Sequence, residues 1–172
     1  MSRIIRLLVM FSVSLLVACG PAPESKADLQ VEENKAIANR YYKEIWSQGK
    51  LDVIDEIFAS DFVHHEPIVG EVRGPGGFKK YASILLTAFP DVQLTIEDQI
   101  AEGDKVVTRW TCTATHKGEL IGIPPTGVQV TWTGIDILRI AGGKVVESWV
   151  IADDFSLFQQ LGVVPPIGQS EE

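Results

Sequence analysis

The sequence has 172 residues, of which 45% are hydrophobic and 22% are charged, and it contains two cysteines. This composition predicts a single globular domain with a packed core, and it excludes an intrinsically disordered chain or a small scaffold held by disulfides. The formal net charge of −8 at pH 7 argues against nucleic acid and anionic lipid headgroups as partners, because both repel an acidic surface.

Residues 1–18 have the pattern of a secretory signal. Two arginines precede a mainly apolar run, residues 7–18, which is too short to span a bilayer. The run ends in the letters LVAC at 16–19, which resemble the lipobox of bacterial lipoproteins. The resemblance implies cleavage before Cys19 and acylation of its sulfur, and Gly20 resembles the signal for the outer membrane of a double-membraned bacterium. We therefore expect a lipid-anchored protein of the cell envelope, with an ordinary secretory signal as the open alternative.

Residues 19–31 are rich in Pro, Ala, Ser and charge, which predicts a flexible tether between lipid and folded body. The domain is expected to span residues 32–164, followed by a C-terminal tail, residues 165–172. Besides Cys19 the chain has one cysteine, Cys112, so no intramolecular disulfide is expected.

Three helices are predicted before the main strands. An apolar stripe at helical spacing favours a first helix from about residue 32 to Gly49, and residues 52–58 favour a short second helix. Residues 61–67, DFVHHEP, are β-prone, whereas Gly70 to Gly77 is expected to break regular structure. The third helix should begin at Pro75 and end before Pro90.

The second half of the domain alternates with a period of two, which is typical of strands that bury one face. The alternation covers residues 92–96, 110–116 and 130–138, and the letters EGDK at 102–105 and AGGK at 141–144 are hairpin signals. Helices followed by such strands predict an α+β fold. We expect a cone in which three helices pack on one face of a strongly bent antiparallel sheet.

Five segments together resemble the SnoaL-like polyketide cyclase and ester cyclase family, of the nuclear transport factor 2-like superfamily. They are YYKEIWSQGKLDVIDEIFASDFVHHEP, GPGGFKKY, AFPDVQLTIEDQIAEGDKVVTRWTCTATHKGELIGIPPTG, GIDILRIAGGKVVESW and FQQLG, which fall in order between residues 34 and 162. The resemblance implies a cystatin-like cone that forms a homodimer through the outer face of its sheet. It also implies an intramolecular aldol ring closure in which an aspartate, at the position of Asp153, acts as acid and base. The cyclases carry a histidine where this chain has Asp136 and an asparagine where it has His64.

Two polar residues interrupt the apolar face of the predicted strands. Alternation places Asp136 on the face of Val130 and Leu138, and His116 on the face of Trp110. An unpaired carboxylate there would cost several kcal/mol, so Asp136 needs a partner or a raised pKa. If His116 meets Asp136 across the strands, the two form an oriented acid/base pair, and a purely structural polar pair stays an open alternative.

The consecutive acids Asp153 and Asp154 lie between the last strand and an amphipathic helix. Alternation groups Asp153 with Trp149 and opposite Val150, but it leaves open which face borders the cavity. We expect Asp153 at the cavity as the acid/base, and Asp154 at the start of the helix as a cap. The alternative, in which Asp153 is the capping acid, stays open.

The remaining candidates are expected to contact the substrate. His64 and His65 point to opposite faces if their segment is extended, so at most one lines the cavity; local features favour His65 slightly, and the resemblance points equally at His64. Apolar walls for a hydrophobic ligand are expected from four tryptophans, with a role in the core as the alternative: Trp46, Trp110, Trp132 and Trp149.

No cofactor is implied, because nucleotide-binding glycine motifs and tightly spaced metal ligands are both lacking in the sequence. The function that we expect is cofactor-free acid/base chemistry on a small hydrophobic carbonyl compound in a cone-shaped pocket. The alternative is a lipoprotein of the same fold that binds a small ligand without converting it.

Overall fold

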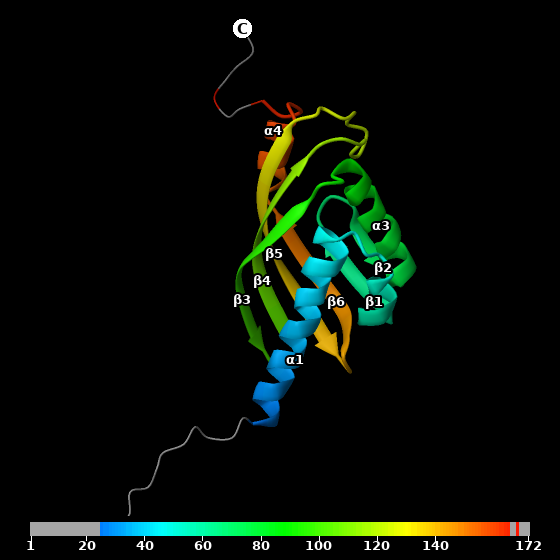
Figure 1. Cartoon of the computed structure of the whole chain (residues 1–172), viewed down its shortest axis with the longest axis vertical. Coiled ribbons are helices and arrows are strands. Elements are labelled where there is room, and N and C mark those ends of the chain that lie inside the picture. The colour runs from blue at the N-terminus through cyan, green and yellow to red at the C-terminus, as the bar shows by residue number, and fades with distance from the viewer. Residues whose placement is uncertain (1–24, 166–167, 169–172) are drawn as a thin grey trace, which may run out of the picture.

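The computed structural model describes residues 25–165 and 168, and it shows one curved sheet with helices against its concave face (Figure 1). The signal segment, residues 1–18, and Cys19 lie outside the described residues. The elements in chain order are α1 (Lys26–Arg40), the π-helix η1 (Tyr41–Ser47), α2 (Val53–Ile57), β1 (Phe58–Glu66), β2 (Gly70–Arg73), α3 (Gly74–Ala88), β3 (Gln93–Glu102), β4 (Lys105–Thr115), β5 (Gln129–Ala141), β6 (Lys144–Ala152) and α4 (Asp154–Gln160).

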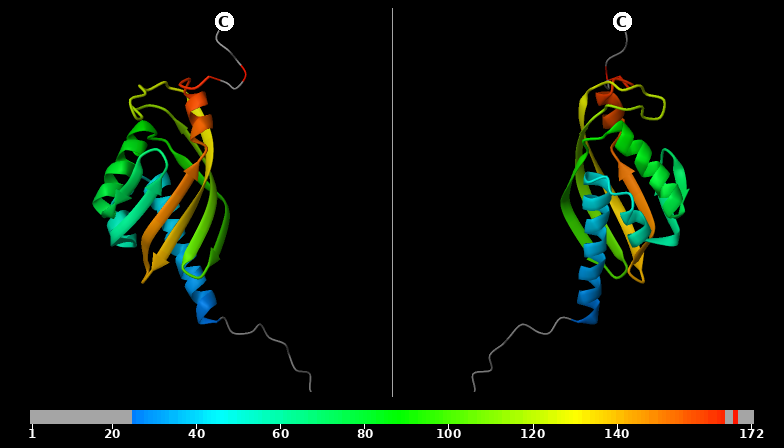
Figure 2. Two further views of the ribbon diagram at one scale, coloured as in Figure 1. Left: turned by 180° about the vertical axis from the view of Figure 1, so that it is seen from behind. Right: turned by 45° about the vertical axis from the view of Figure 1, so that its right-hand side comes forward.

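The sheet has six strands in the order β2-β1-β6-β5-β4-β3. Strands β3 to β6 form an antiparallel meander, and β1 pairs with β2 antiparallel. Strand β1 pairs with β6 in parallel, so the expected purely antiparallel sheet is mixed. The reason is topological: α3 carries the chain from the β2 edge to the opposite edge, and the meander returns so that β6 lies beside β1 (Figure 2). The predicted α+β cone is confirmed.

The first helix begins earlier than predicted. Helix α1 starts at Lys26, because Ser25 and Asp28 form a capping box in which each side chain bonds the backbone N–H of the other residue. Residues 26–31, assigned to the tether from composition, are therefore helical. The helix continues without interruption into η1, whose wider turn buries the neighbouring residues Tyr41 and Tyr42 together.

The segment expected to break regular structure, residues 70–77, contains strand β2, and α3 begins at Gly74, one residue before the predicted start at Pro75. Gly70 pairs with Glu66 and Arg73 pairs with Val63. The glycines of this segment predicted a break in regular structure. The segment forms a short edge strand because pairing with β1 provides hydrogen-bond partners for its backbone groups. None of the helices within residues 25–165 has the length and hydropathy that crossing a membrane requires.

The concave face of the sheet carries the core, as the period-two alternation predicted. Along β4 the residues Val106, Thr108, Trp110, Cys112 and Ala114 are all buried. The helices close this face from the other side, with α1 and α3 lying against the sheet in both views of Figure 2. Side chains from η1, β1 and α3 then fill the space between helices and sheet.

The convex face of the sheet is exposed and partly apolar. Ile135 and Ile151 face each other on β5 and β6 and are 48% and 66% exposed. The homodimer interface expected on this face stays a prediction.

The loop between β4 and β5 closes one end of the cone, and it is held against the last turn of α3. The backbone N–H groups of Lys117 and Gly118 both donate to the carbonyl of Ala88, at 2.8 and 3.1 Å. A Cβ atom on Gly118 would lie 2.3 Å from the carbonyl oxygen of Thr87. Because that contact is with backbone, no side-chain movement relieves it.

We therefore expect Gly118→Ala to lower the free energy of unfolding by about 2–4 kcal/mol. The matched control is Gly76→Ala within α3, where a Cβ meets nothing within 4 Å. Alanine is the better helix former, so the control should gain about 0.5–1 kcal/mol. Urea denaturation of the three proteins measures both effects, and equal stabilities for Gly118→Ala and the wild type would contradict the tight packing.

Candidate active site

A cavity of about 130 Å³ lies between the concave face of the sheet and the helices η1 and α3. Seven aromatic side chains line it: Tyr41, Trp46, Tyr81, Phe89, Trp110, Trp132 and Phe158. The turn between β1 and β2 and the loop between β4 and β5 contribute aliphatic side chains at the rim, among them Ile68 and Ile121. The cavity therefore suits a hydrophobic ligand.

Apart from two tyrosines and one cysteine, the ionisable side chains in the wall are one imidazole and three carboxyl groups. They are His64 on β1, Glu66 at the end of β1, Asp136 on β5 and Asp154 at the start of α4. Neither lysine nor arginine is present among the described residues that line the cavity. Carboxyl groups in an apolar enclosure are disfavoured in their charged form, so their protonation state becomes the central property of the site.

Asp136 lies at the base of the cavity and is only 4% exposed. Its Oδ2 accepts a hydrogen bond from the Tyr42 hydroxyl at 3.2 Å, and its Oδ1 accepts one from the Trp110 indole Nε1 at 3.0 Å. Burial raises the pKa of Asp136 to about 7, while the two hydrogen bonds act in the opposite direction because they favour the carboxylate. Asp136 can therefore both take and return a proton near neutral pH.

The second carboxyl group of the cavity is Asp154. Burial, together with the negative charges of Glu66 and Asp153, raises its pKa to about 6. Glu66 is held in place because its two carboxylate oxygens accept hydrogen bonds from the backbone N–H groups of Ile68 and Val69, at 3.1 and 2.7 Å.

The expected positions of the two neighbouring aspartates are reversed in the structure. Asp153 is exposed and caps α4, accepting a hydrogen bond from the backbone N–H of Ser156 at 3.0 Å. Asp154 lines the cavity instead. By the alternation along β6, Asp154 falls on the same side as Ser148 and Val150. Once that side is known to be the concave one, the alternation predicts that Asp154 faces the cavity.

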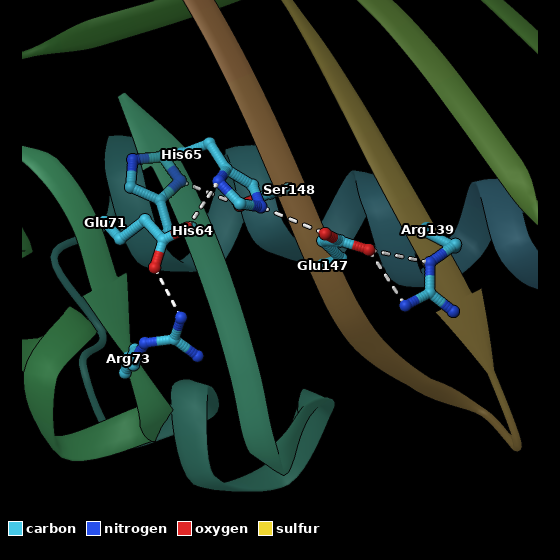
Figure 3. Close-up of polar contacts among 7 residues, drawn as sticks. All are labelled: His64, His65, Glu71, Arg73, Arg139, Glu147 and Ser148. Atoms are coloured by element: carbon cyan, nitrogen blue, oxygen red, sulfur yellow. Dashed lines mark hydrogen bonds and ion pairs between the residues drawn. The ribbon is translucent and has the colours of Figure 1, made fainter. Parts of the chain in front are cut away.

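The two histidines of β1 lie on opposite faces, as predicted, and His64 is the one that borders the cavity. It is 2% exposed, and its Nδ1 lies 2.7 Å from the Ser148 hydroxyl (Figure 3). Burial, with a smaller effect from His65, lowers the pKa of His64 to about 4, so the ring is neutral at physiological pH. Its Nε2 has no hydrogen-bond partner among the described residues.

His65, which local features favoured, lies on the convex face. Its Nε2 is 3.0 Å from Glu147, which in turn binds Arg139, and its Nδ1 faces Glu71 (Figure 3). The ring stacks on Trp149 with 5.4 Å between ring centres. His65 and Trp149 therefore do not contact a ligand in the cavity, because alternation along β1 and β6 directs both away from it.

His116 does not meet Asp136, so the proposed acid/base pair is wrong. The residue opposite Asp136 across the sheet is Thr108, whereas His116 lies just beyond the far end of β4. Its Nδ1 accepts a hydrogen bond from the backbone N–H of Thr126 at 3.3 Å, and its ring packs on Phe89. His116 holds the loop that closes the cone, which is a structural position.

Of the four tryptophans, Trp46, Trp110 and Trp132 line the cavity. Sequence reasoning did not identify the tyrosines of the site, Tyr41, Tyr42 and Tyr81. Their spacing is that of an ordinary apolar helix stripe, and in the structure Tyr42, which lies in the π-helix η1, donates to Asp136. Within the part of the chain that the structure describes, no group of three His, Cys, Asp or Glu side chains could hold a metal ion.

Three features of this cavity together support proton transfer. The wall is mainly apolar, two carboxyl groups have pKa values near neutrality, and a neutral imidazole lines the same cavity. Such a set can remove a proton from a carbon next to a carbonyl group and protonate an oxygen, which are the two halves of an enolisation or an aldol reaction.

A sequence profile of the SnoaL-like polyketide cyclase family matches residues 36–161. Among characterised proteins, the aklanonic acid methyl ester cyclase DnrD of Streptomyces peucetius is 28% identical over 125 residues, which cover 69% of this chain and 84% of DnrD. The aklanonic acid methyl ester cyclase DauD of Streptomyces sp. strain C5 is also 28% identical, with 69% of this chain and 76% of DauD covered.

Solved structures share the fold. AclR from Streptomyces galilaeus, a candidate hydroxylase, is 35% identical with a TM-score of 0.71, covering 81% of this chain and 87% of AclR. A candidate SnoaL-like polyketide cyclase from Jannaschia sp. CCS1 has a TM-score of 0.75 at 24% identity, with 84% of this chain and 99% of that chain covered, which supports the fold alone.

The raised pKa of Asp136 predicts a pH-dependent cost to stability. The folded chain binds this proton more tightly than the unfolded chain, whose aspartate titrates near 3.8, so Asp136 lowers the free energy of unfolding progressively as the pH rises from about 4 to about 7. In Asp136→Asn the amide has no charge to bury. It still accepts from Trp110, and it can donate to the Tyr42 hydroxyl.

We expect Asp136→Asn to be more stable than the wild type at pH 8 by about 2–4 kcal/mol, with the difference closing as the pH is lowered toward 4. Chemical denaturation of both proteins across this pH range measures the difference directly. A difference that does not change with pH would show that Asp136 titrates normally in the folded chain.

Proposed function

The chain belongs to the SnoaL-like polyketide cyclase family, and on this basis we propose that it catalyses a cofactor-free intramolecular ring closure of a hydrophobic carbonyl compound. One observation carries the proposal: two carboxyl groups with pKa values of about 7 and about 6 share one aromatic cavity. A protein that only bound an apolar ligand would gain nothing from burying these two groups. The relatives DnrD and DauD are themselves ester cyclases.

The two carboxyl groups are assigned to the two halves of an aldol reaction. Asp136, as carboxylate, removes a proton from a carbon next to a carbonyl group of the substrate. The resulting carbon nucleophile attacks a second carbonyl carbon of the same molecule, forming the C–C bond and closing the ring. Asp154, as carboxylic acid, protonates the oxygen that becomes a hydroxyl group, and the product is an isomer of the substrate.

This division of roles rests on the position of each group. It requires the state in which Asp136 is ionised and Asp154 is protonated, which is the less populated state of the pair because Asp136 has the higher pKa. Asp136 is almost fully enclosed and fixed by two donors, which suits a base that must meet one particular carbon atom. Asp154 is partly exposed at the rim, where it can exchange its proton with solvent between turnovers. The neutral His64 and the aromatic walls exclude water from the carbon nucleophile.

The likeness to AclR supplies a second candidate, a hydroxylation. The two reactions differ in the mass of the product, because ring closure leaves the mass unchanged and hydroxylation adds one oxygen atom. Hydroxylation is an oxidation, so the assay must also supply molecular oxygen and a two-electron donor. Aklanonic acid methyl ester is the first substrate to test, with mass spectrometry and chromatography of the products. A product of unchanged mass and altered retention supports the cyclase, and a heavier product supports the hydroxylase.

The proposed roles predict that substitutions of the two neighbouring aspartates have different effects on turnover. We expect Asp154→Asn to lower kcat about 10²- to 10⁴-fold, since the amide cannot donate the proton, and Asp136→Asn to cause a loss of the same size. Asp153→Asn is the matched control: it changes the neighbouring acid in the same way, but an asparagine still caps α4. The control should keep wild-type turnover and lose at most about 1 kcal/mol of stability.

Steady-state kinetics of the three variants, with circular dichroism to verify the fold, test this assignment. A large loss of turnover in Asp153→Asn, with Asp154→Asn unaffected, would restore Asp153 as the working carboxyl group. Turnover that survives in Asp136→Asn would remove it as the base.

We also propose that the protein is exported and held at the cell envelope by acyl chains on Cys19. The support is the lipobox-like sequence at 16–19, which lies outside the described residues. Cys19→Ala should move the protein from the membrane fraction to the soluble fraction, because several acyl chains are needed for stable attachment. The control Cys112→Ala should stay membrane-bound, and an unmodified mature N-terminus in the wild-type mass spectrum would refute the proposal.

A further inference from the structure

The indole of Trp110 lies directly over the backbone of the neighbouring strand at Gly134. Trp110 and Gly134 are paired residues on β4 and β5. A Cβ atom built on Gly134 would lie 2.2, 2.7 and 2.8 Å from the indole atoms Cζ2, Cη2 and Cε2. Such distances are shorter than any real contact, so the ring occupies the space that every other residue type would need for its side chain.

This close approach decides where the indole N–H points. Asp136 lies two residues after Gly134 on β5, on the same concave face. With its ring lying over Gly134, Trp110 brings Nε1 to within 3.0 Å of Asp136 Oδ1. A side chain at position 134 would push the ring away and break this bond. The absence of a Cβ atom at Gly134 thus allows the hydrogen bond between Trp110 and Asp136.

The second carboxylate oxygen is fixed independently. Tyr42 donates to Asp136 Oδ2 from η1, on the opposite side of the cavity. With one donor on each oxygen, the plane of the carboxylate cannot rotate freely, and the remaining lone pairs have set directions. A base that must reach one carbon atom benefits from such a fixed orientation.

We infer that Trp110 is a positioning residue that orients Asp136 and keeps it in the carboxylate form, and that Gly134 is the position that permits this arrangement. The catalytic consequence rests on the proposed function, but the orientation and the titration of Asp136 do not. Loss of the indole N–H removes a donor that favours the charged form, so more of the enzyme carries a protonated Asp136, which cannot act as a base.

The other ionisable groups around Asp136 lie on the helices and strands that pack around it. Tyr41 and Tyr42 approach from η1 and Tyr81 from α3, and all three remain neutral because burial raises their pKa values. His64 on β1 is neutral as well. Asp154, on α4 at the rim of the same cavity, is the remaining acid that titrates near neutral pH, so its signal must be resolved from that of Asp136.

The test is a titration of Asp136 by carbon-13 NMR of protein labelled at the aspartate carboxyl carbons, with Asp136→Asn identifying the signal. We expect a pKa of about 7 in the wild type and a value about one pH unit higher in Trp110→Phe. Trp132→Phe is the matched control, because this tryptophan lines the same cavity and makes no hydrogen bond to Asp136. It should leave the pKa of Asp136 unchanged.

The role of Gly134 is tested by a double-mutant cycle. Gly134→Ala should destabilise the wild type strongly and should also raise the pKa of Asp136. Phenylalanine at position 110 lacks the second ring, whose atoms make the close contacts. In the Trp110→Phe background, Gly134→Ala should therefore cost much less stability and leave the pKa where Trp110→Phe set it.

An unchanged pKa of Asp136 in a folded Trp110→Phe variant would overturn the inference, and so would a Gly134→Ala effect equal in both backgrounds. If turnover is found, the pH–rate profile of Trp110→Phe should move to higher pH, with kcat lowered at neutral pH and restored as the pH is raised. A failure to detect ring closure would affect the proposed function alone, since the titration needs no substrate.

Discussion

Placing an ionisable carboxyl group on the apolar concave face of a sheet is the constraint on which the rest of this site depends. Asp136 is tolerated there only because protein groups replace the water it loses, and each of its oxygens receives one donor. The donors come from different layers of the fold. Tyr42 donates from the π-helix η1 in the helical layer, and Trp110 donates from the neighbouring strand β4 in the sheet. Tyr42 belongs to the π-helix η1 and the Trp110 ring lies over Gly134, so the two donors of one carboxylate depend on two layers of the fold.

The apolar enclosure also explains why the cavity titrates in the range that acid/base catalysis needs. Burial raises the pKa of Asp136 at the base and of Asp154 at the rim, and it lowers the pKa of His64. All three shifts favour the uncharged form, so a cavity with several ionisable residues can still accept a hydrophobic carbonyl compound. The group at the base is the more strongly shifted of the two acids because it is the more completely buried.

Strand β1 separates two electrostatic environments that differ by one residue in the sequence. On the concave side, His64 is neutral and bonds a serine hydroxyl. On the convex side, the His65 ring contacts the carboxylates of Glu147 and Glu71, and Glu147 also pairs with Arg139, where water screens the charges. The sheet thus keeps the ion pairs outside and the uncharged donors and acceptors inside, although the sequence places the two histidines side by side.

The sequence by itself determined the helices, the strands of the meander and the face on which Asp136, Trp110 and Trp132 lie, because alternation in a strand depends only on neighbouring residues. Alternation cannot say which face becomes concave, so the choice between Asp153 and Asp154 waited for the tertiary structure. Only the strand register placed His116 far from Asp136, and only the parallel pairing of β1 with β6 brought His64 beside Ser148. Register and pairing depend on contacts between distant segments, which no local pattern contains.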